Sequence, residues 1–222
     1  PVGVHLAQAK CYAYIYATRN ELETIGVRMT YCNMETEEIK YFHESYTYEE
    51  LQVWFTQLLT EYKKWTDFQF AWNKERTESI KQLVFPFPYR EGQKELVTYA
   101  YQTIYHRRNL FLEAPTGVGK TISTVFPSVK AMGEGMAEKL FYLTAKTITR
   151  TVAQDCFKLL ADKGLRMKTV VITAKDKICP MEETECNPDY CPYAKGHFDR
   201  INDAMYELLQ SEDHFTRDTI LE

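Results

Sequence analysis

Residues 113–121 read Glu-Ala-Pro-Thr-Gly-Val-Gly-Lys-Thr, a combination that can bind phosphate. Glycines let backbone N–H groups close around phosphate oxygens, and the N-terminus of a following helix adds a favourable field for an anion. Lys120 can reach the outer phosphates of a nucleotide, and the Thr121 hydroxyl can ligate Mg²⁺. The sequence therefore predicts a nucleoside triphosphate site that comprises Ala114, Pro115, Thr116, Gly117, Val118, Gly119, Lys120 and Thr121.

The elements on either side of this loop fit the same interpretation. Three apolar residues at 110–112 predict a buried strand, and a helix is expected from about Ile122 to Met132. Strand, loop, Lys-Thr and helix is the order that a phosphate-binding loop needs. Ala114 stands where the usual pattern G-x-x-x-x-G-K-S/T has its first glycine, which costs little if the backbone there does not need a positive φ. The alternative is a glycine-containing turn with an incidental Lys-Thr.

Composition limits the remaining possibilities. The 222 residues suit one or two domains, and the formal net charge is −4. Seven Lys or Arg against two Asp between residues 139 and 168 predict a basic surface that could face phosphates, or a solvated helix face. The sequence has no run of eighteen apolar residues and no signal peptide, so we expect a cytoplasmic protein with no membrane partner. The first residue is not Met, so a processed form or an excised piece is expected.

Hydrophobic periodicity divides the chain near residue 85. Before it, the pattern predicts a helix at 4–17, strands at 27–31 and 39–42, and helices at 49–65 and 68–83. Residues 85–89, Phe-Pro-Phe-Pro-Tyr, break any regular element. After them we expect helices at 91–106, 149–163 and 194–209, and strands at 110–112, 140–143 and 169–173. Strands that alternate with helices indicate a parallel α/β sheet, here incomplete.

Three cysteines in a proline-rich stretch are candidate ligands. Cys179, Cys186 and Cys191 lie within thirteen residues, with prolines at 180, 188 and 192. Such a segment cannot be a regular helix or strand, and thiolate ligation would hold it in place. An iron–sulfur site needs four thiolates, whereas a zinc site or chance thiols are the alternatives. The other cysteines, Cys11, Cys32 and Cys156, are expected to be small buried hydrophobic residues. Asp213 is expected to cap a short last helix.

From residue 85 onward the chain resembles iron–sulfur superfamily-two DNA helicases of the XPD/DinG type. Residues 89–93 resemble the family's adenine-sensing segment, residues 114–121 its phosphate loop with the same alanine, and residues 144–147 with Gln154 its DNA-backbone segment. The resemblance implies that Gln93 reads adenine, that Lys120 is catalytic, and that Thr121 holds Mg²⁺. It also implies that Cys179, Cys186 and Cys191 hold a 4Fe–4S cluster whose fourth cysteine lies beyond residue 222.

A second resemblance lies near the N-terminus. Residues 8–12, Gln-Ala-Lys-Cys-Tyr, are similar to the helical Gln-x-x-x-Tyr signature of RecB-like (PD-(D/E)XK) nucleases. Together the two resemblances imply an α/β fold: a RecA-like P-loop motor lobe with a partial parallel sheet and an inserted cysteine-rich helical iron–sulfur domain, preceded by a small α+β segment. The expected domains are the tail of a nuclease or a joining module at 1–84, the first part of motor lobe 1 at 85–175, and a partial iron–sulfur domain at 176–222.

The implied function is that of an N-terminal fragment of an ATP-dependent DNA helicase. The parent would couple ATP hydrolysis to 5′-to-3′ translocation on single-stranded or forked DNA, as a monomer in DNA repair or replication, fused to a nuclease. No Asp-Glu-Ala-His motif occurs between Thr121 and Glu222, so negligible ATPase activity is expected of this piece alone. Two other classes remain open: a nucleotide-gated binding module with a structural zinc and a protein partner, and a nuclease-associated clamp without a motor.

Overall fold

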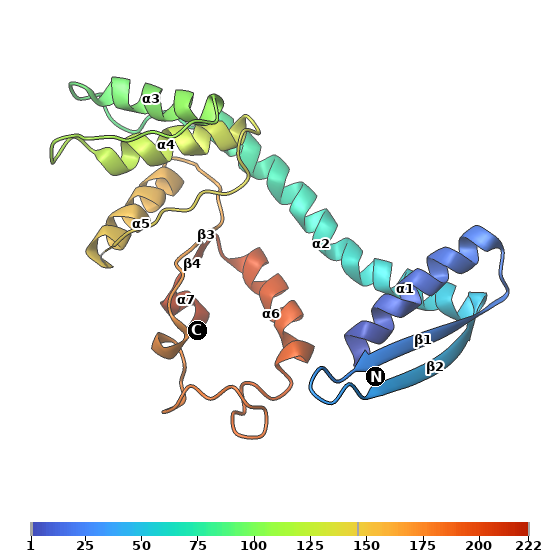
Figure 1. Cartoon of the computed structure of the whole chain (residues 1–222). Coiled ribbons are helices and arrows are strands. Elements are labelled where there is room, and N and C mark those ends of the chain that lie inside the picture. Colours follow the sequence, from blue (N-terminus) through green and yellow to red (C-terminus); the bar gives the residue numbers. More distant parts are fainter. Residues whose placement is uncertain (1, 146, 222) are drawn as a thin grey trace. The chain divides into compact units, whose positions relative to one another are not determined.

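The computed structural model of the chain describes residues 2–145 and 147–221, and all of their side chains except those of residues 147 and 148. It contains two compact units, residues 1–69 and 70–222 (Figure 1). Each unit has a hydrophobic core of its own. Helix α2 (Tyr48–Gln82) begins in the first unit and ends in the second. Within the described ranges, no helix is both long and apolar enough to cross a membrane.

The first unit pairs a helix with a β-hairpin. Helix α1 (Gly3–Asn20) is followed by strands β1 (Thr24–Cys32) and β2 (Ile39–Thr47), which confirms the predicted helix and both predicted strands. The strands run antiparallel with Thr24 opposite Thr47 and Cys32 opposite Ile39. Successive residues of a strand point to opposite faces, so Val27 and Met29 are buried on the inner face while Arg28 is exposed on the outer one.

Helix α2 is one continuous helix of 35 residues, so the prediction of two helices is wrong. The sequence has no glycine or proline between residues 48 and 82 to interrupt the turns. Its start is fixed by a capping box: the Thr47 N–H donates to Glu50 Oε2 at 2.8 Å, and the Glu50 N–H donates to Thr47 Oγ1 at 3.2 Å. Local pairs such as Lys63 with Asp67 support its exposed middle.

The second unit is mostly helical. It contains α3 (Gln93–Tyr105), α4 (Lys120–Gly133), α5 (Thr147–Asp162), α6 (His197–Ser211), the short α7 (Arg217–Leu221) and a 3₁₀ turn at Lys175–Lys177. The predicted helices after residue 85 are therefore confirmed. The last helix does not begin at the expected cap, Asp213: a strand intervenes, and Thr216 bonds to Thr219 at the start of α7 instead.

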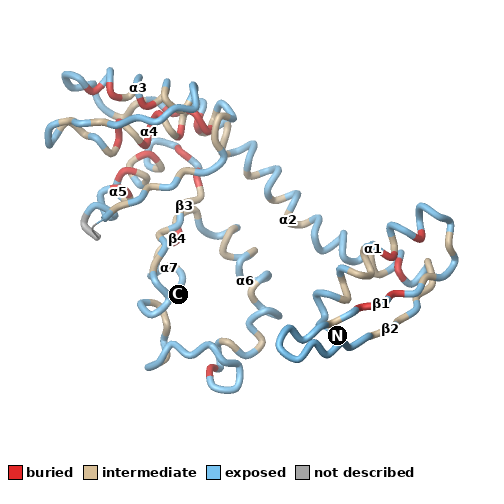
Figure 2. Tube along the Cα trace, in the orientation of Figure 1, coloured by how far each residue is buried: buried red, intermediate tan, exposed pale blue. Residues whose placement is uncertain are grey.

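Helix α4 lies between α3 and α5 and supplies much of the core of this unit (Figures 1 and 2). Val125 and Val129 of α4 pack in one cluster with Leu160 of α5 and Ile80 of α2. The ammonium of Lys130 completes the contact, because it donates to the carbonyls of residues 80, 81 and 83 at 2.9–3.3 Å. A cation at these last carbonyls of α2 is favoured by the helix dipole.

The predicted parallel sheet forms only in small part. Among the described residues of this unit, the hydrogen-bonded strands are β3 (Thr169–Val170) and β4 (His214–Phe215), which pair in parallel. Segments 110–112 and 140–143 are irregular rather than strands, and Phe111 and Leu143 are 96% and 88% exposed. A strand needs neighbours that pair with its backbone, and within the described structure these segments have none, although Leu140 and Tyr142 pack against the core. The fold is thus mixed α/β with a majority of helix.

Gly133 offers a sharp test of the α2–α4 contact. Its backbone is helical, so alanine would favour the helix by about 1 kcal/mol if space allowed. A Cβ there would, however, clash with Cγ2 of Ile80. We expect Gly133→Ala to lower the free energy of unfolding by about 1–3 kcal/mol in urea denaturation.

The control is Gly3→Ala in α1, where a Cβ meets nothing within 4 Å. On an Ile80→Ala background the same Gly133→Ala change should cost much less, because only the Cβ of residue 80, at 3.1 Å, remains close to it. An equal cost on both backgrounds would contradict the contact.

Candidate functional site

The phosphate loop leads directly into helix α4. Residues 113–119 form no regular element, and α4 begins at Lys120 after a cap at Gly119. Gly117 and Gly119 have φ angles of 85° and 79°, the left-handed region that favours glycine. Described non-glycine residues with positive φ are Glu21, Glu37 and Arg107, so Ala114 has an ordinary backbone and the substitution of its glycine is tolerated.

Lys120 folds back over its own loop. Its ammonium donates to the carbonyl of Ala114 at 2.7 Å and to that of Pro115 at 3.0 Å. The hydroxyl of Thr121 lies 3.4 Å from the hydroxyl of Tyr142. Both side chains that the sequence predicts to act on phosphate and Mg²⁺ therefore stand at the junction of the loop and α4. An ammonium held by two neutral carbonyls gains energy when an anionic oxygen replaces them.

Gln93, predicted to read adenine, is in this structure the internal support of the loop. Its side chain is only 3% exposed, with Nε2 donating to the Val118 carbonyl at 3.0 Å and Oε1 accepting from the Arg90 N–H at 3.1 Å. The guanidinium of Arg90 donates to the Gly117 carbonyl. A Cβ on Gly119 would approach Gln93 Nε2 to 2.7 Å, so a side chain there would displace the amide from the Val118 carbonyl, and the φ of 79° favours glycine independently.

These contacts give the loop the polarity that an anion requires. The carbonyls of residues 114, 115, 117 and 118 all accept hydrogen bonds from Lys120, Arg90 or Gln93. A loop whose carbonyls are satisfied by internal donors can offer its amides, and the N-terminus of α4, to a phosphate. The residues present thus fit a nucleotide phosphate. The adenine-reading role of Gln93 stays a prediction.

The predicted DNA-backbone segment lines a cavity in the same unit. Thr144, Ala145 and Gln154 border a space of about 1060 Å³, together with Arg150 and Lys158. Lys146 and the side chain of Thr147 lie outside the described residues. The basic stretch at 139–168 is only partly available to a ligand, because two of its seven cations are engaged in ion pairs with acidic side chains of the same unit: Arg166 with Glu75 and Asp213, and Lys168 with Asp213.

The thiols of the cysteine-rich segment influence the pKa of one lysine. The pKa of Lys175 is raised, chiefly by hydrogen bonding to Cys186 and by the charge of that thiol, with smaller contributions from Cys179 and Cys191. Cys186 is exposed, Cys179 is half-buried and Cys191 is buried. Across the described part of the chain, however, no three His, Cys, Asp or Glu side chains are disposed to hold a metal ion. Ligation of a cluster by this trio therefore stays a prediction.

The remaining cysteines, predicted to be buried, differ in their exposure. Cys156 is a buried residue of α5, as predicted, and burial raises its pKa to about 11. Cys11 is half-buried. Cys32 is exposed near the end of β1, so the prediction of a buried residue is wrong there: it belongs to the outer face of a hairpin that is covered on one side only.

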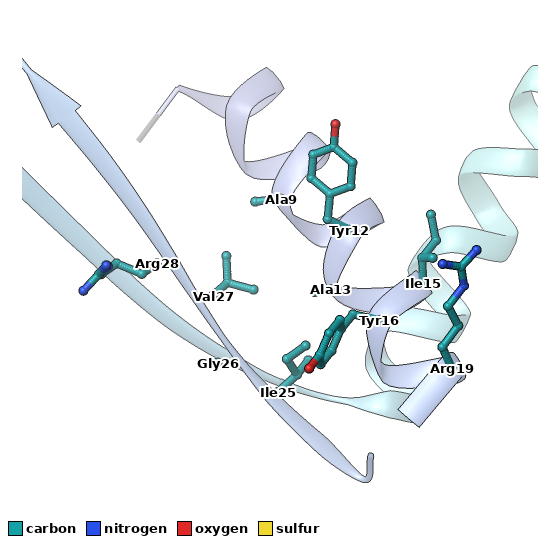
Figure 3. Close-up of a pocket in the computed structure, with 10 residues that line it drawn as sticks. All are labelled: Ala9, Tyr12, Ala13, Ile15, Tyr16, Arg19, Ile25, Gly26, Val27 and Arg28. Atoms are coloured by element: carbon teal, nitrogen blue, oxygen red, sulfur yellow. The ribbon is translucent and has the colours of Figure 1, made fainter. Parts of the chain in front are cut away.

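The Gln-x-x-x-Tyr pair of α1 is in contact, as one helical turn predicts. Gln8 Nε2 donates to the Tyr12 hydroxyl at 3.3 Å. Tyr12 also borders a cavity of about 510 Å³ between α1 and β1, with Tyr16, Arg19 and Ile25 around it (Figure 3). The geometry agrees with the signature without assigning a nuclease to it.

A charged cluster that was not predicted from the sequence joins the two ends of the cysteine-rich segment, residues 171–213. Strand β3 precedes this segment and β4 follows it, with the Thr169 N–H donating to the Asp213 carbonyl at 2.8 Å. Lys168 donates to Asp213 Oδ1 at 2.7 Å and to the carbonyls of Leu209 and Glu212 at the end of α6. Arg166 donates to the other carboxylate oxygen at 2.8 Å. In the sequence, the signal for this cluster is limited to the opposite charges of Lys168 and Asp213, which lie 45 residues apart.

The comparisons with known proteins point to a helicase. Over 120 residues, 53% of this chain, the sequence is 32% identical to a protein of Methanocaldococcus jannaschii named "probable ATP-dependent helicase". The chain spans about a fifth of the length of that relative, 18%. No family model and no solved structure matches the chain. The similarity is therefore to part of a helicase and carries no finer class.

A substitution that keeps the size of the Gln93 side chain tests whether its amide supports the loop. Gln93→Glu replaces the donor opposite the Val118 carbonyl by an oxygen, and a buried unmatched group costs about 1–3 kcal/mol. We expect a lower melting temperature and about tenfold weaker binding of a fluorescent ATP analogue. Gln102→Glu, on the exposed part of α3, is the control and should change neither. Unchanged affinity and stability in Gln93→Glu would contradict the role of this amide.

The Asp213 cluster predicts a pH dependence of stability. Burial alone would raise the pKa of Asp213, but hydrogen bonds from Arg166 and Lys168 together with their charge lower it below its ordinary value. A depressed folded pKa gives stability that is present above the unfolded value of about 3.9 and is lost as pH falls through the folded pKa.

Asp213→Asn should therefore destabilise the protein at pH 7 by about 1–3 kcal/mol and should weaken the loss of stability between pH 5 and pH 3. Urea unfolding at pH 7, pH 5 and pH 3 measures both effects, with Asp155→Asn on the exposed side of α5 as the control. An unaltered acid dependence in Asp213→Asn would refute the assignment.

Proposed function

We propose that this chain forms part of the motor of an ATP-dependent helicase, with residues 114–121 as its ATP phosphate site. The observation that carries the proposal is the loop itself: its carbonyls are bound by internal donors, and Lys120 stands at the first turn of α4. The partial similarity to a probable helicase supports the same conclusion. The chain spans only 18% of the length of that relative, so the activity of the whole protein is part of the proposal.

The roles of the site residues follow from their chemistry. On nucleotide binding, Lys120 would exchange its two carbonyl partners for oxygens of the outer phosphates. Thr121 would offer its hydroxyl to Mg²⁺, which supplies charge neutralisation when bound. Gln93 and Arg90 would hold the loop in shape while the phosphates enter. Gln93 can contact adenine only if one end of its amide exchanges an internal partner for the base.

The finer assignment is a proposal that rests on resemblance. We infer a DNA helicase of the XPD/DinG type that moves 5′ to 3′ on single-stranded DNA, fused to a RecB-like nuclease and active in DNA repair or replication. Residues 85–175 would be the first part of the motor, 176–222 the cysteine-rich domain, and 1–84 the nuclease tail. Support comes from Thr144, Ala145 and Gln154 on one cavity and from the Gln8–Tyr12 contact.

A 4Fe–4S cluster at Cys179, Cys186 and Cys191 also stays a proposal. The shared influence of these thiols on Lys175 supports their proximity, while the described side chains contain no arrangement ready for a metal. No step of the mechanism is assigned to it.

Lys120→Ala tests the proposed function. Loss of the ammonium that meets the phosphates should weaken binding of a fluorescent ATP analogue with Mg²⁺ at least tenfold, because a charge-assisted hydrogen bond contributes about 1.5–3 kcal/mol. Lys94→Ala, an exposed lysine of α3, is the matched control and should bind as the wild type does. Equal affinity of Lys120→Ala and the wild type would exclude this loop as the nucleotide site.

A further inference from the structure

The outer face of the β1–β2 hairpin is exposed except at Thr47, which caps α2. The inner face carries Val27 and Met29 and packs with α1, so the alternate residues point the other way. Figure 3 shows the Arg28 side chain extending from β1 away from Tyr12 and Tyr16 of α1. We call the following exposed residues the outer hairpin face: Thr24, Gly26, Arg28, Thr30 and Cys32 of β1, and Ile39, Tyr41, His43 and Ser45 of β2.

Two aromatic rings and a guanidinium form the centre of this face. Tyr41 and His43 are two residues apart on β2, with ring centroids 6.4 Å apart at an interplanar angle of 37°. Arg28 lies opposite His43 in the register, and its guanidinium carbon is 5.5 Å from the Tyr41 ring centroid. Tyr41 is 52% exposed although aromatic side chains usually seek burial.

The charge and chemistry of this face are selective. None of its nine residues is acidic, and the exposed carboxylates nearest to it in the sequence lie beyond its ends, at Glu23 and in the turn at Glu35, Glu37 and Glu38. Glu44, the acidic residue of β2 beside them, lies on the inner face and accepts a hydrogen bond from Tyr46. Thr24, Thr30 and Ser45 add hydroxyl donors, and a Cβ on Gly26 would meet nothing within 4 Å, so a ligand backbone can approach closely.

Exposed rings, a cation and hydroxyls without carboxylates match the chemistry of single-stranded nucleic acid. Bases stack on aromatic rings with little regard to sequence, and guanidinium groups bind the phosphates between them. A hydrophobic protein partner would meet little on this face, since Ile39 is its one large aliphatic side chain. The face lies in a different unit from the phosphate loop, so the inference does not depend on nucleotide binding.

We propose that the outer hairpin face binds single-stranded nucleic acid. Tyr41 and His43 stack on neighbouring bases, and Arg28 contacts the phosphate that links them. The hydroxyl groups of Thr30 and Ser45 contact the backbone on either side.

Fluorescence anisotropy with labelled oligothymidylate of about 12 nucleotides tests this surface in the full chain. Tyr41→Ala should weaken binding about tenfold, and Arg28→Ala should both weaken it and reduce its salt dependence. Tyr41→Phe keeps the ring and should bind as the wild type does. Tyr62→Ala is the matched control, because Tyr62 is a 63%-exposed tyrosine of the same unit on α2.

Photocrosslinking of wild-type protein to 5-iodouracil-substituted oligonucleotide gives a readout that does not require a variant to fold. We expect crosslinked peptides that contain residues 39–45. Crosslinks found only in residues 70–222, or unchanged affinity in both Tyr41→Ala and Arg28→Ala, would overturn the proposal, as would no binding of oligothymidylate by the wild type. Loss of nucleotide binding in Lys120→Ala with unchanged oligothymidylate affinity would separate this site from the phosphate loop.

Discussion

A buried amide, with the guanidinium of Arg90 beside it, connects the phosphate loop to the segment before α3. The Gln93 side chain bonds to the backbone of Val118 at one end and of Arg90 at the other, and it fills the space that a side chain on Gly119 would need. A buried amide that loses one partner costs about 1–3 kcal/mol, so the loop and the segment before α3 hold each other in position.

Lysine caps at helix ends organise the surroundings of the site. Lys130 of α4 donates to the last carbonyls of α2, and Lys168 donates to those of α6. Each ammonium satisfies carbonyls that a helix leaves without internal partners and also interacts favourably with the helix dipole. The first cap fixes α4, which begins at the phosphate loop, against the core. The second cap joins the two ends of the cysteine-rich segment, which begins after β3 and ends before β4. A ligand bound by that segment would therefore also affect the residues beside β3.

The sequence predicted those features that depend on local chemistry. Helices α1, α3, α4, α5 and α6 follow from apolar periodicity, and the position of the glycine-containing loop before α4 follows from its motif. The hairpin was also predicted, although its outer face was not recognised as exposed. Residues 110–112 and 140–143 have the composition of strands, but a strand exists only when neighbours pair with it, and neighbours cannot be deduced from the segment itself.

Long-range contacts were beyond sequence analysis for the same reason. Asp213 is of a residue type that often caps helices, yet its side chain binds Arg166 and Lys168, which lie 47 and 45 residues earlier. Gln93 was found through resemblance to an adenine-reading segment, whereas its burial and its contact with Val118 appear only once α3 and α4 are packed together. The continuity of α2 depends on the absence of a breaking residue, a weaker signal than the periodicity that divided it.

Hydrogen–deuterium exchange with and without an ATP analogue and Mg²⁺ would test whether residues 113–121 bind the phosphates of a nucleotide. We expect slower exchange at residues 113–121 and at the start of α4, with a smaller effect at residues 90–93, because the amides of the loop become donors to phosphate while Gln93 and Arg90 retain its carbonyls. Unchanged exchange of the loop at saturating nucleotide, or protection confined to other segments, would contradict it.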